Sequence, residues 1–155
     1  IINSVLEVNH LQKLKLFEKV KNYFGNDLTG KKLALWGLAF KPDTDDIREA
    51  PALYMIDELT KLGADITAFD PEAMENVNSL IGNKIRYASN QYDALRDADA
   101  LLIATEWSVF RNPDFSKIES MLSQKVIFDG RNLFDLDFMT EKGFYYESIG
   151  RKTIG

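Results

Sequence analysis

Cysteine is absent from this chain of 155 residues, and histidine occurs only once, at His10. Without cysteine the chain can form no disulfide, no thiolate zinc site and no covalent intermediate on a thiolate. No apolar run approaches the roughly 20 residues that cross a bilayer, and no signal peptide is visible. These absences favour a cytoplasmic protein that does not contact membranes.

Positive charge is also scarce, since 19 lysines and arginines stand against 24 aspartates and glutamates and give a net charge of -5. Nucleic-acid binding requires a basic surface along the phosphate chain, so this charge balance argues against it. Any phosphate site must therefore be small and local. Apolar residues make up 45% of the chain and charged residues 28%, as in an ordinary globular protein, and the length predicts one domain.

Short apolar runs alternate with amphipathic stretches over most of the chain. The runs, each expected to form a β-strand, are 33–36, 66–69, 85–87, 100–103, 126–128 and 144–146. Pro51 suits a helix start, Gly63 and Gly143 suit helix ends, and Trp36 is expected in the core. Apolar strands separated by helices indicate a parallel sheet covered on both faces. The pattern predicts an α/β fold: a Rossmann-like, doubly wound, mainly parallel sheet of about six strands, preceded by a long N-terminal helix.

Residues 1–24 have the spacing of this N-terminal helix. At 100° per residue, one arc contains Ile2, Val5, Leu6, Leu16, Phe17, Val20, Tyr23 and Phe24. Leu11 and Leu14 fall on the opposite side. A surface helix usually has a single apolar stripe, so the second one predicts a contact with another domain or another chain.

Three cations follow the ends of expected strands. Lys41 and Arg48 come after the first strand, and Arg131 comes after the fifth. Ligands of doubly wound sheets bind beyond the carboxyl ends of the strands, where the strand order reverses. Converging cations at that place are what a diphosphate requires. Loop cations of this kind are also often solvated or paired with nearby carboxylates, and the residues alone leave both interpretations open.

The loop after the first strand is not a dinucleotide fingerprint. Gly37 is followed by Leu-Ala-Phe, so the second and third glycines of the G-x-G-x-x-G pattern are missing. Phe40 would obstruct a pyrophosphate at this point but could lie against a flat base or ribose. Asp70, which ends the second strand, is interpreted as a turn and helix-start residue and not as a ribose-binding acid.

Acidic residues at 43–46 could suggest a hard metal ion, but we interpret them as capping residues, with Asp46 and Glu49 as a capping pair. No metal ligand and no catalytic residue is therefore assigned. Glu106 could act as an acid or base, although no neighbour in the sequence tunes it. Trp107 is either a core residue or a pocket wall, and the sequence leaves the two roles open.

Residues 37–51, with the sequence GLAFKPDTDDIREAP, resemble the signature of the UDP-glucose/GDP-mannose dehydrogenase family in its UDP-binding C-terminal domain. Three shorter motifs, 69–71, 104–107 and 129–132, follow in the order that the family has. Residues 8–12 resemble the end of the long central helix that joins the two halves of these enzymes and forms their dimer interface. The resemblance covers essentially the whole chain.

The family oxidises a nucleotide sugar twice, from alcohol to acid, and reduces two NAD. The resemblance implies that Phe40, Lys41 and Arg131 contact a UDP-sugar, while Arg48 reaches NAD held by the other half. Residues 105–107 resemble the branch that converts UDP-glucose to UDP-glucuronate. The family's nucleophilic cysteine and its NAD-binding loop belong to domains absent from this sequence, so the isolated chain is expected to be an inactive fragment.

The resemblance divides the chain in two. Residues 1–26 are expected to be the C-terminal part of the central linking and dimerisation helix, and residues 27–155 the UDP-sugar-binding domain. The expected partners are the UDP-sugar, the NAD-binding and central domains of the same enzyme, and a second copy of the N-terminal helix. Two alternatives remain: a dehydrogenase of another UDP-sugar, such as UDP-N-acetylmannosamine, and a stand-alone nucleotide-binding regulatory module.

Overall fold

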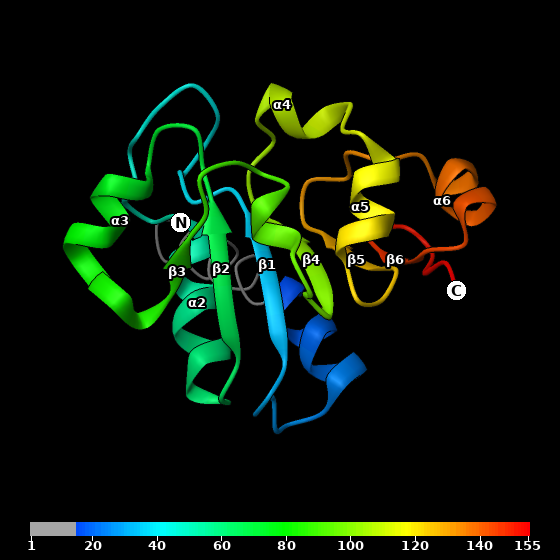
Figure 1. The fold of residues 1–155 in the computed structure, drawn as a ribbon, viewed down its shortest axis with the longest axis horizontal. Coiled ribbons are helices and arrows are strands. Elements are labelled where there is room, and N and C mark those ends of the chain that lie inside the picture. Colours follow the sequence, from blue (N-terminus) through cyan, green and yellow to red (C-terminus); the bar gives the residue numbers. More distant parts are fainter. Residues whose placement is uncertain (1–14) are drawn as a thin grey trace, which may run out of the picture.

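A computed structural model describes residues 15–155 (Figure 1). A six-stranded sheet of order β3-β2-β1-β4-β5-β6 forms its centre, and all neighbouring strands are parallel. The strands are β1 (Lys32–Trp36), β2 (Asp65–Phe69), β3 (Arg86–Tyr87), β4 (Ala100–Ile103), β5 (Val126–Asp129) and β6 (Tyr145–Glu147). The strand order reverses between β1 and β4, which confirms the predicted doubly wound, Rossmann-like fold.

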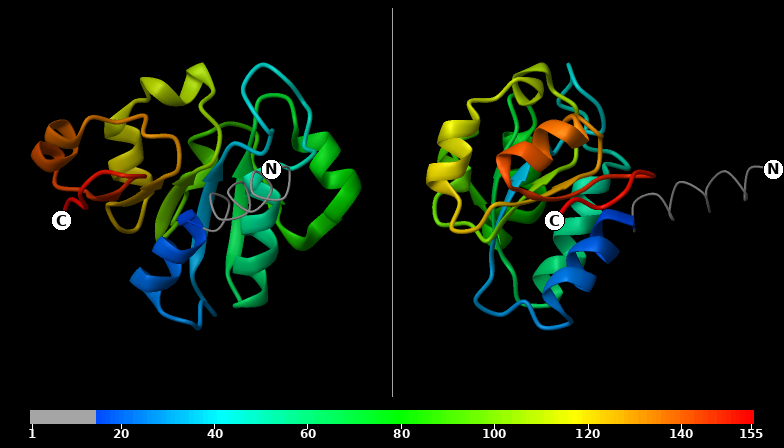
Figure 2. Two further views of the ribbon diagram at one scale, coloured as in Figure 1. Left: turned by 180° about the vertical axis from the view of Figure 1, so that it is seen from behind. Right: turned by 90° about the vertical axis from the view of Figure 1, so that its right-hand side faces the viewer.

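Helices cover both faces of this sheet. They are α2 (Pro51–Lys61), α3 (Met74–Ile81), α4 (Ser108–Arg111), α5 (Phe115–Met121) and α6 (Leu136–Lys142), with short 3-10 helices η1 (Gly82–Lys84) and η2 (Asp93–Leu95). Residues 15–24 are also helical. They lie with α2 on one face of the sheet, and α5 lies on the other (Figure 2).

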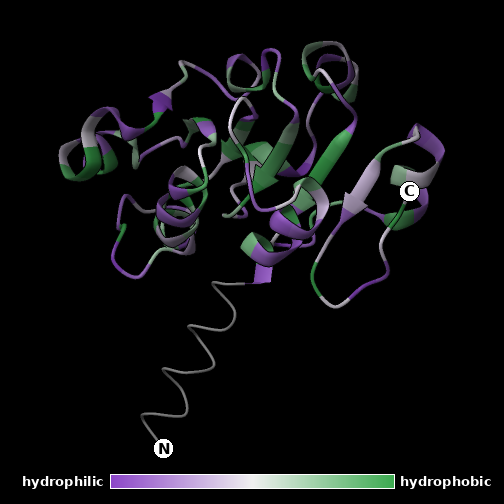
Figure 3. Ribbon diagram, turned by 90° about the horizontal axis from the view of Figure 1, so that it is seen from below, coloured by the Kyte–Doolittle hydropathy of each residue, from purple (hydrophilic) through white to green (hydrophobic). Residues whose placement is uncertain are grey.

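The three central strands form the core. Every residue of β4 and β5 is buried, as is β1 after its first residue, because helices exclude water from both faces. Figure 3 shows these strands as the hydrophobic centre of the ribbon. Trp36 is fully buried, stacks on Phe110 with 4.9 Å between ring centroids, and donates its indole N–H to the carbonyl of Gln91. Its predicted place in the core is confirmed.

Most of the predicted helix ends are also confirmed. Pro51 begins α2, and Gly63 follows the end of that helix with a φ of 101°. Gly143 ends α6 in the left-handed conformation, which glycine adopts without a Cβ penalty. The expectation that Asp46 and Glu49 cap a helix is wrong, because α2 begins only at Pro51, after Ala50, and has no side-chain cap. Asp46 instead accepts the backbone N–H of Arg48.

The described part of the N-terminal helix packs against this domain. Leu16, Phe17 and Val20 are buried, and the Tyr23 ring lies 4.5 Å from the Tyr145 ring between centroids. The main apolar arc therefore covers the chain's own sheet at these positions. Residues 1–14, which include His10, Leu11, Leu14 and the motif at 8–12, lie outside the described part of the chain.

The end of the chain protects the edge of the sheet beside β6. Ile154 pairs with Tyr146 in an antiparallel bridge, through backbone hydrogen bonds of 2.9 Å in both directions. Asn132 also exchanges hydrogen bonds with the backbone of Ile149. Within residues 15–155, no helix has the length and apolar character needed to cross a membrane.

Candidate functional site

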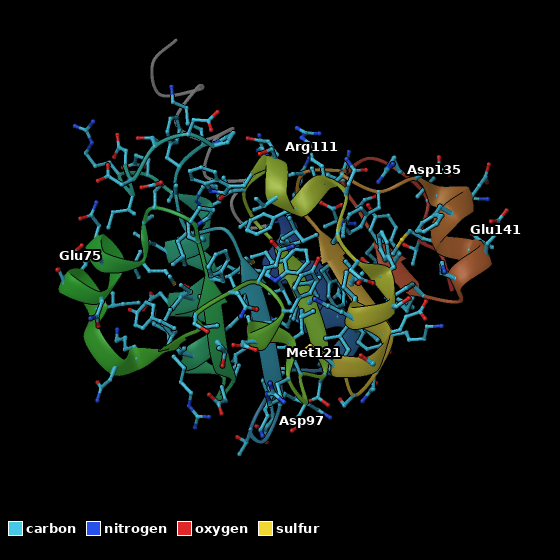
Figure 4. The ribbon with its side chains drawn as sticks, turned by 45° about the horizontal axis from the view of Figure 1, so that its top comes forward. Glu75, Asp97, Arg111, Met121, Asp135 and Glu141 are labelled. Carbon is cyan, nitrogen blue, oxygen red and sulfur yellow. The ribbon has the colours of Figure 1, made fainter. Side chains whose placement is uncertain are left out.

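The loops that follow β1, β4 and β5 leave the sheet side by side. Trp36 is in register with Ile103, and Ile103 is in register with Asp129, so the three strands end at one level. This carboxyl edge lies at the top of Figure 1, below α4. Figure 4 turns it toward the reader, with Arg111 of α4 and Asp135 along it. The sequence-predicted site residues all lie on these loops.

Two of the loops are locked together at their base. Gly37 has a φ of 100°, and a Cβ at this position would lie only 2.6 Å from the Cβ and the backbone nitrogen of Thr105. The Thr105 hydroxyl donates a 2.8 Å hydrogen bond to the carbonyl of Ala39. Glycine is therefore required after β1 so that the loop after β4 can pack directly against it.

Asp70, fully buried after β2, connects the same loops. Its Oδ2 accepts hydrogen bonds from the backbone N–H groups of Leu38 and Ala39, at 2.7 and 2.9 Å, and from Trp107 Nε1 at 3.1 Å. Its Oδ1 accepts from the backbone N–H groups of residues 72 and 73. The second set confirms the predicted turn role, whereas sequence reasoning missed the first. The predicted helix-start role is not met, because α3 begins at Met74 and has no side-chain cap. The first set places Trp107 in the core.

The backbone donors after β1 are all used internally. The N–H of Gly37 donates to the carbonyl of Phe69, the next two donate to Asp70, and that of Phe40 donates to the carbonyl of Asp46. Dinucleotide-binding loops direct N–H groups of this kind at a pyrophosphate. Since none of these four remains available here, this loop does not bind a phosphate in the way that a dinucleotide-binding loop does.

The same loop presents an aromatic ring and two cations. Phe40 is 48% exposed, and Lys41 Nζ lies 6.0 Å from the centroid of its ring. The Arg48 side chain, 88% exposed, binds Asp46 through Nη2 and Oδ2 at 2.8 Å and through Nε and Oδ1 at 3.0 Å. Hydrogen bonds from the Arg48 side chain and backbone lower the pKa of Asp46 to about 2. This ion pair closes the turn that carries Arg48.

Arg131 lies on the loop after β5 and binds Glu106 from the loop after β4. Both Nε and Nη2 of Arg131 contact Glu106 Oε2, and the Glu106 side chain is only 17% exposed. The open role of Glu106 is therefore resolved structurally: it is the counter-ion of Arg131. Both arginines of the predicted site are therefore paired with carboxylates. This pairing was one of the two interpretations of the loop cations that the sequence left open.

Asp129, which ends β5, fixes the backbone before this cation. Its carboxylate accepts from the N–H groups of Arg131 at 2.9 Å and Leu133 at 2.7 Å, and from the Tyr146 hydroxyl at 2.7 Å. Burial first, and then the adjacent Asp129, raise the pKa of Tyr146 well above its ordinary value, so the phenol remains a donor. An acid at the end of a strand was the available sequence signal for both Asp70 and Asp129.

We also searched the rest of residues 15–155 for an alternative binding site. Among residues 15–155, no group of three or more His, Cys, Asp or Glu side chains is placed to hold a metal ion. A depression of about 510 Å³ lies at the opposite edge of the sheet, where Val126 and Tyr145 begin β5 and β6. It contains none of the predicted site residues, so the carboxyl edge remains the candidate site.

Comparisons with known proteins identify the family to which this sequence is similar. Residues 34–136 match the UDP binding domain of the UDP-glucose/GDP-mannose dehydrogenase family. UDP-glucose 6-dehydrogenase TuaD of Bacillus subtilis is 39% identical over 154 residues, which are 99% of this chain and 33% of that protein. The UDP-glucose 6-dehydrogenase of Pseudomonas aeruginosa is 41% identical over 160 residues, which cover all of this chain and 35% of that protein.

Solved structures of similar proteins share the fold. A UDP-glucose dehydrogenase from Pyrobaculum islandicum superposes with a TM-score of 0.73 at 29% identity, over 84% of this chain and 28% of that one. A UDP-D-ManNAc dehydrogenase from Pyrococcus horikoshii superposes with a TM-score of 0.68 at 26% identity, over 92% and 31% of the two chains. The chain thus spans about a third of the length of the curated relatives that it matches.

Proposed function

Because the chain belongs to the UDP-glucose/GDP-mannose dehydrogenase family, we propose that its carboxyl edge binds the nucleotide portion of a UDP-sugar. The main support is the placement of these side chains at the edge where the strand order reverses between β1 and β4. Phe40 and Lys41 lie on the loop after β1, and Arg131, on the loop after β5, is bonded to Glu106 of the loop after β4. In an acidic protein, cations on the loops at this edge of the sheet are suited to a diphosphate.

Each of the three side chains has a separate task in this proposal. The exposed ring of Phe40 offers a flat surface to the uracil or ribose, and Lys41 beside it supplies a positive charge to the diphosphate. Arg131 supplies a planar guanidinium whose position is fixed by Glu106 and by the loop bonds of Asp129. A side chain held in place before binding loses less conformational entropy when the ligand arrives.

NAD does not fit the switch point of this chain. The loop after β1 has lost the second and third glycines of the fingerprint, and its backbone N–H groups are already bonded to the protein. We therefore assign NAD to another domain of the complete enzyme, with Arg48 as the contact from this chain. The exposed position of the Arg48 side chain supports that assignment. To reach NAD, Arg48 would have to break its ion pair with Asp46 or share it with the cofactor.

We propose UDP-glucose as the sugar nucleotide and its oxidation to UDP-glucuronate, with two hydride transfers to NAD, as the reaction of the complete enzyme. The support is the identity of 39–41% to proteins named UDP-glucose 6-dehydrogenase, against 26% to the UDP-D-ManNAc dehydrogenase structure. The covalent step of such a reaction needs a nucleophile such as a thiolate. Since this chain has no cysteine, we expect it to bind nucleotide without turnover.

The division of the chain into a linking helix at 1–26 and a UDP-sugar domain at 27–155 remains a proposal. We further propose that the N-terminal helix pairs with its copy in a second subunit, on the side that carries Leu11 and Leu14. Leu16 and Val20, which belong to the main apolar arc, are buried against the chain's own domain. Their burial supports the proposal that the opposite side of the helix contacts the second subunit. A cytoplasmic location likewise stays a prediction.

Calorimetric titration of the chain with UDP tests the proposed site. Lys41→Ala and Arg131→Ala should each weaken binding by about 1.5–3 kcal/mol, the range for lost hydrogen bonds to charged groups. Arg48→Ala should leave UDP binding unchanged, because we assign that side chain to NAD.

Lys152→Ala is the matched control, since Lys152 is exposed and its removal changes the net charge by the same unit. Its UDP affinity should equal that of the wild type. The site is wrong if UDP does not bind the wild type, or if Lys41→Ala and Arg131→Ala bind it as well as Lys152→Ala does.

A further inference from the structure

The carboxylate of Asp70 occupies the place of a ligand. In dinucleotide-binding folds, the N–H groups after the first strand face a pyrophosphate, and an acid at the end of the second strand binds ribose. Here the acid at the end of β2 turns inward instead, and its Oδ2 accepts the N–H groups of Leu38 and Ala39 at 2.7 and 2.9 Å. The protein thus supplies its own anion to this loop.

The five hydrogen bonds to Asp70 join three loops into one unit. Two bonds come from the loop after β1, two from the turn after β2, and one from Trp107 in the loop after β4. Asp70 is fully buried, so water does not compete for these donors. A buried carboxylate is stable only when it is bonded in this way, and the donors in turn need an acceptor.

Lys41 and Arg131 are each connected through one or two neighbouring residues to a group that donates to Asp70. Ala39 donates to Asp70 and is separated from Lys41 by Phe40 alone. Trp107 donates to Asp70 and is preceded by Glu106, the counter-ion of Arg131. Displacement of the carboxylate would therefore disturb the loops on both sides of the switch point.

We propose that Asp70 is a positioning residue that acts as an internal substitute for a bound phosphate, and that it sets Lys41 and the Glu106–Arg131 pair for a nucleoside diphosphate. The proposal rests on the proposed UDP site. The negative charge is essential to it, because a neutral amide would present one N–H₂ group among donors that all require an acceptor.

UDP titration of folded variants tests the role of Asp70. Asp70→Asn preserves the volume and removes the charge, so we expect at least a 10-fold loss of UDP affinity while far-ultraviolet circular dichroism stays that of the wild type. In Asp70→Ala, sodium formate should recover part of the lost affinity by providing a small carboxylate to the vacated donors, whereas formate should not alter the wild type.

Asp114→Ala is the control for a merely structural carboxylate. Asp114 caps α5 by accepting from the backbone N–H groups of Ser116 and Lys117. Its loss should lower the melting temperature but leave the UDP affinity of the folded protein within twofold of the wild type. A purely structural role for Asp70 would give the same pattern: reduced stability, unchanged affinity and no response to formate.

The proposal is overturned if Asp70→Asn binds UDP within twofold of the wild type while Lys41→Ala shows its expected loss. If neither Asp70 variant folds, Trp107→Phe decides, since it removes one donor to Oδ2 and keeps an aromatic side chain. It should weaken UDP binding about threefold, and an unchanged affinity would refute the role of Asp70. Failure of the proposed function is recognised separately, by equal UDP binding in the wild type and Lys41→Ala.

Discussion

Buried carboxylates at strand ends organise the carboxyl edge at the scale of single residues. Asp70 after β2 and Asp129 at the end of β5 each accept several hydrogen bonds from their own loops. Asp46, by contrast, is only half-buried and orders the turn that holds Arg48. The proposed ligand-binding side chains thus lie on loops whose backbones are held by hydrogen bonds to buried carboxylates. These bonds limit the conformational freedom of the loops before the ligand binds.

Gly37→Ala tests the close approach of the two loops. Alanine would have to adopt a φ near 100°, and its Cβ would overlap the backbone of Thr105 at 2.6 Å. We expect the free energy of unfolding to fall by about 3 kcal/mol or more, since conformational strain and steric overlap add. Urea denaturation measures the loss.

Gly25→Ala is the matched control for that variant. Gly25 has a nearly identical φ of 97°, but a Cβ there would meet no atom within 4 Å. Only the strain of about 1–2 kcal/mol should remain. Equal losses in the two variants would show that the contact with Thr105 is not tight.

At the scale of elements, the helix at 15–24 packs against the loop that carries Arg131. A Cβ on Gly130 would lie 3.2 Å from Leu16 Cδ2 and 3.0 Å from the carbonyl oxygen of Ile103. Glycine at this position therefore lets the helix pack closely over the end of β5. Lys19 adds an ion pair of 3.7 Å to Glu147 of β6, so the helix contacts two strands of the sheet.

Leu16→Ala measures how firmly this helix is held. Leu16 is 6% exposed, and truncation of a buried leucine costs about 2–4 kcal/mol of unfolding free energy. Lys15→Ala, at the exposed neighbouring position, should change stability by no more than about 0.5 kcal/mol. A loss for Leu16→Ala as small as that of Lys15→Ala would mean that the helix does not pack on the domain in solution.

At the scale of the whole molecule, the two edge strands of the sheet are protected from pairing in different ways. Strand β3 has only two residues, whereas β6 is covered by the returning chain at Ile154. Short or covered edges resist pairing with the sheet of another molecule. Self-association through the N-terminal helix is therefore more consistent with this architecture than association through the sheet.

Sedimentation equilibrium tests that association. We expect a weak dimer whose fraction rises with concentration, because a specific interface usually buries at least about 1,000 Å² in total and one helix supplies little area. The double variant Leu11→Glu/Leu14→Glu should be monomeric, since it places charges on the proposed contact. If the wild type dimerises and the double variant does so equally well, that side of the helix is not the interface.

The sequence alone determined the fold, and it placed the candidate site residues after the ends of strands. Six apolar runs coincided with the six strands, and Gly63 and Gly143 marked helix ends, because burial and positive φ are local requirements that each residue must meet by itself. The missing glycines after Gly37 likewise excluded a dinucleotide fingerprint, and strand ends located the cations. The sequence did not predict which acid binds which cation.

Tertiary structure decided the partners. Asp70 lies 32 residues from Leu38 and 37 from Trp107, and Glu106 lies 25 from Arg131. Those contacts arise only because parallel strands in the order β2-β1-β4-β5 end at the same level and bring distant loops together. A local pattern shows that Asp70 can start a turn, but it does not reveal a second carboxylate oxygen facing another loop. Strand order and register determine that contact, and both are properties of the assembled sheet.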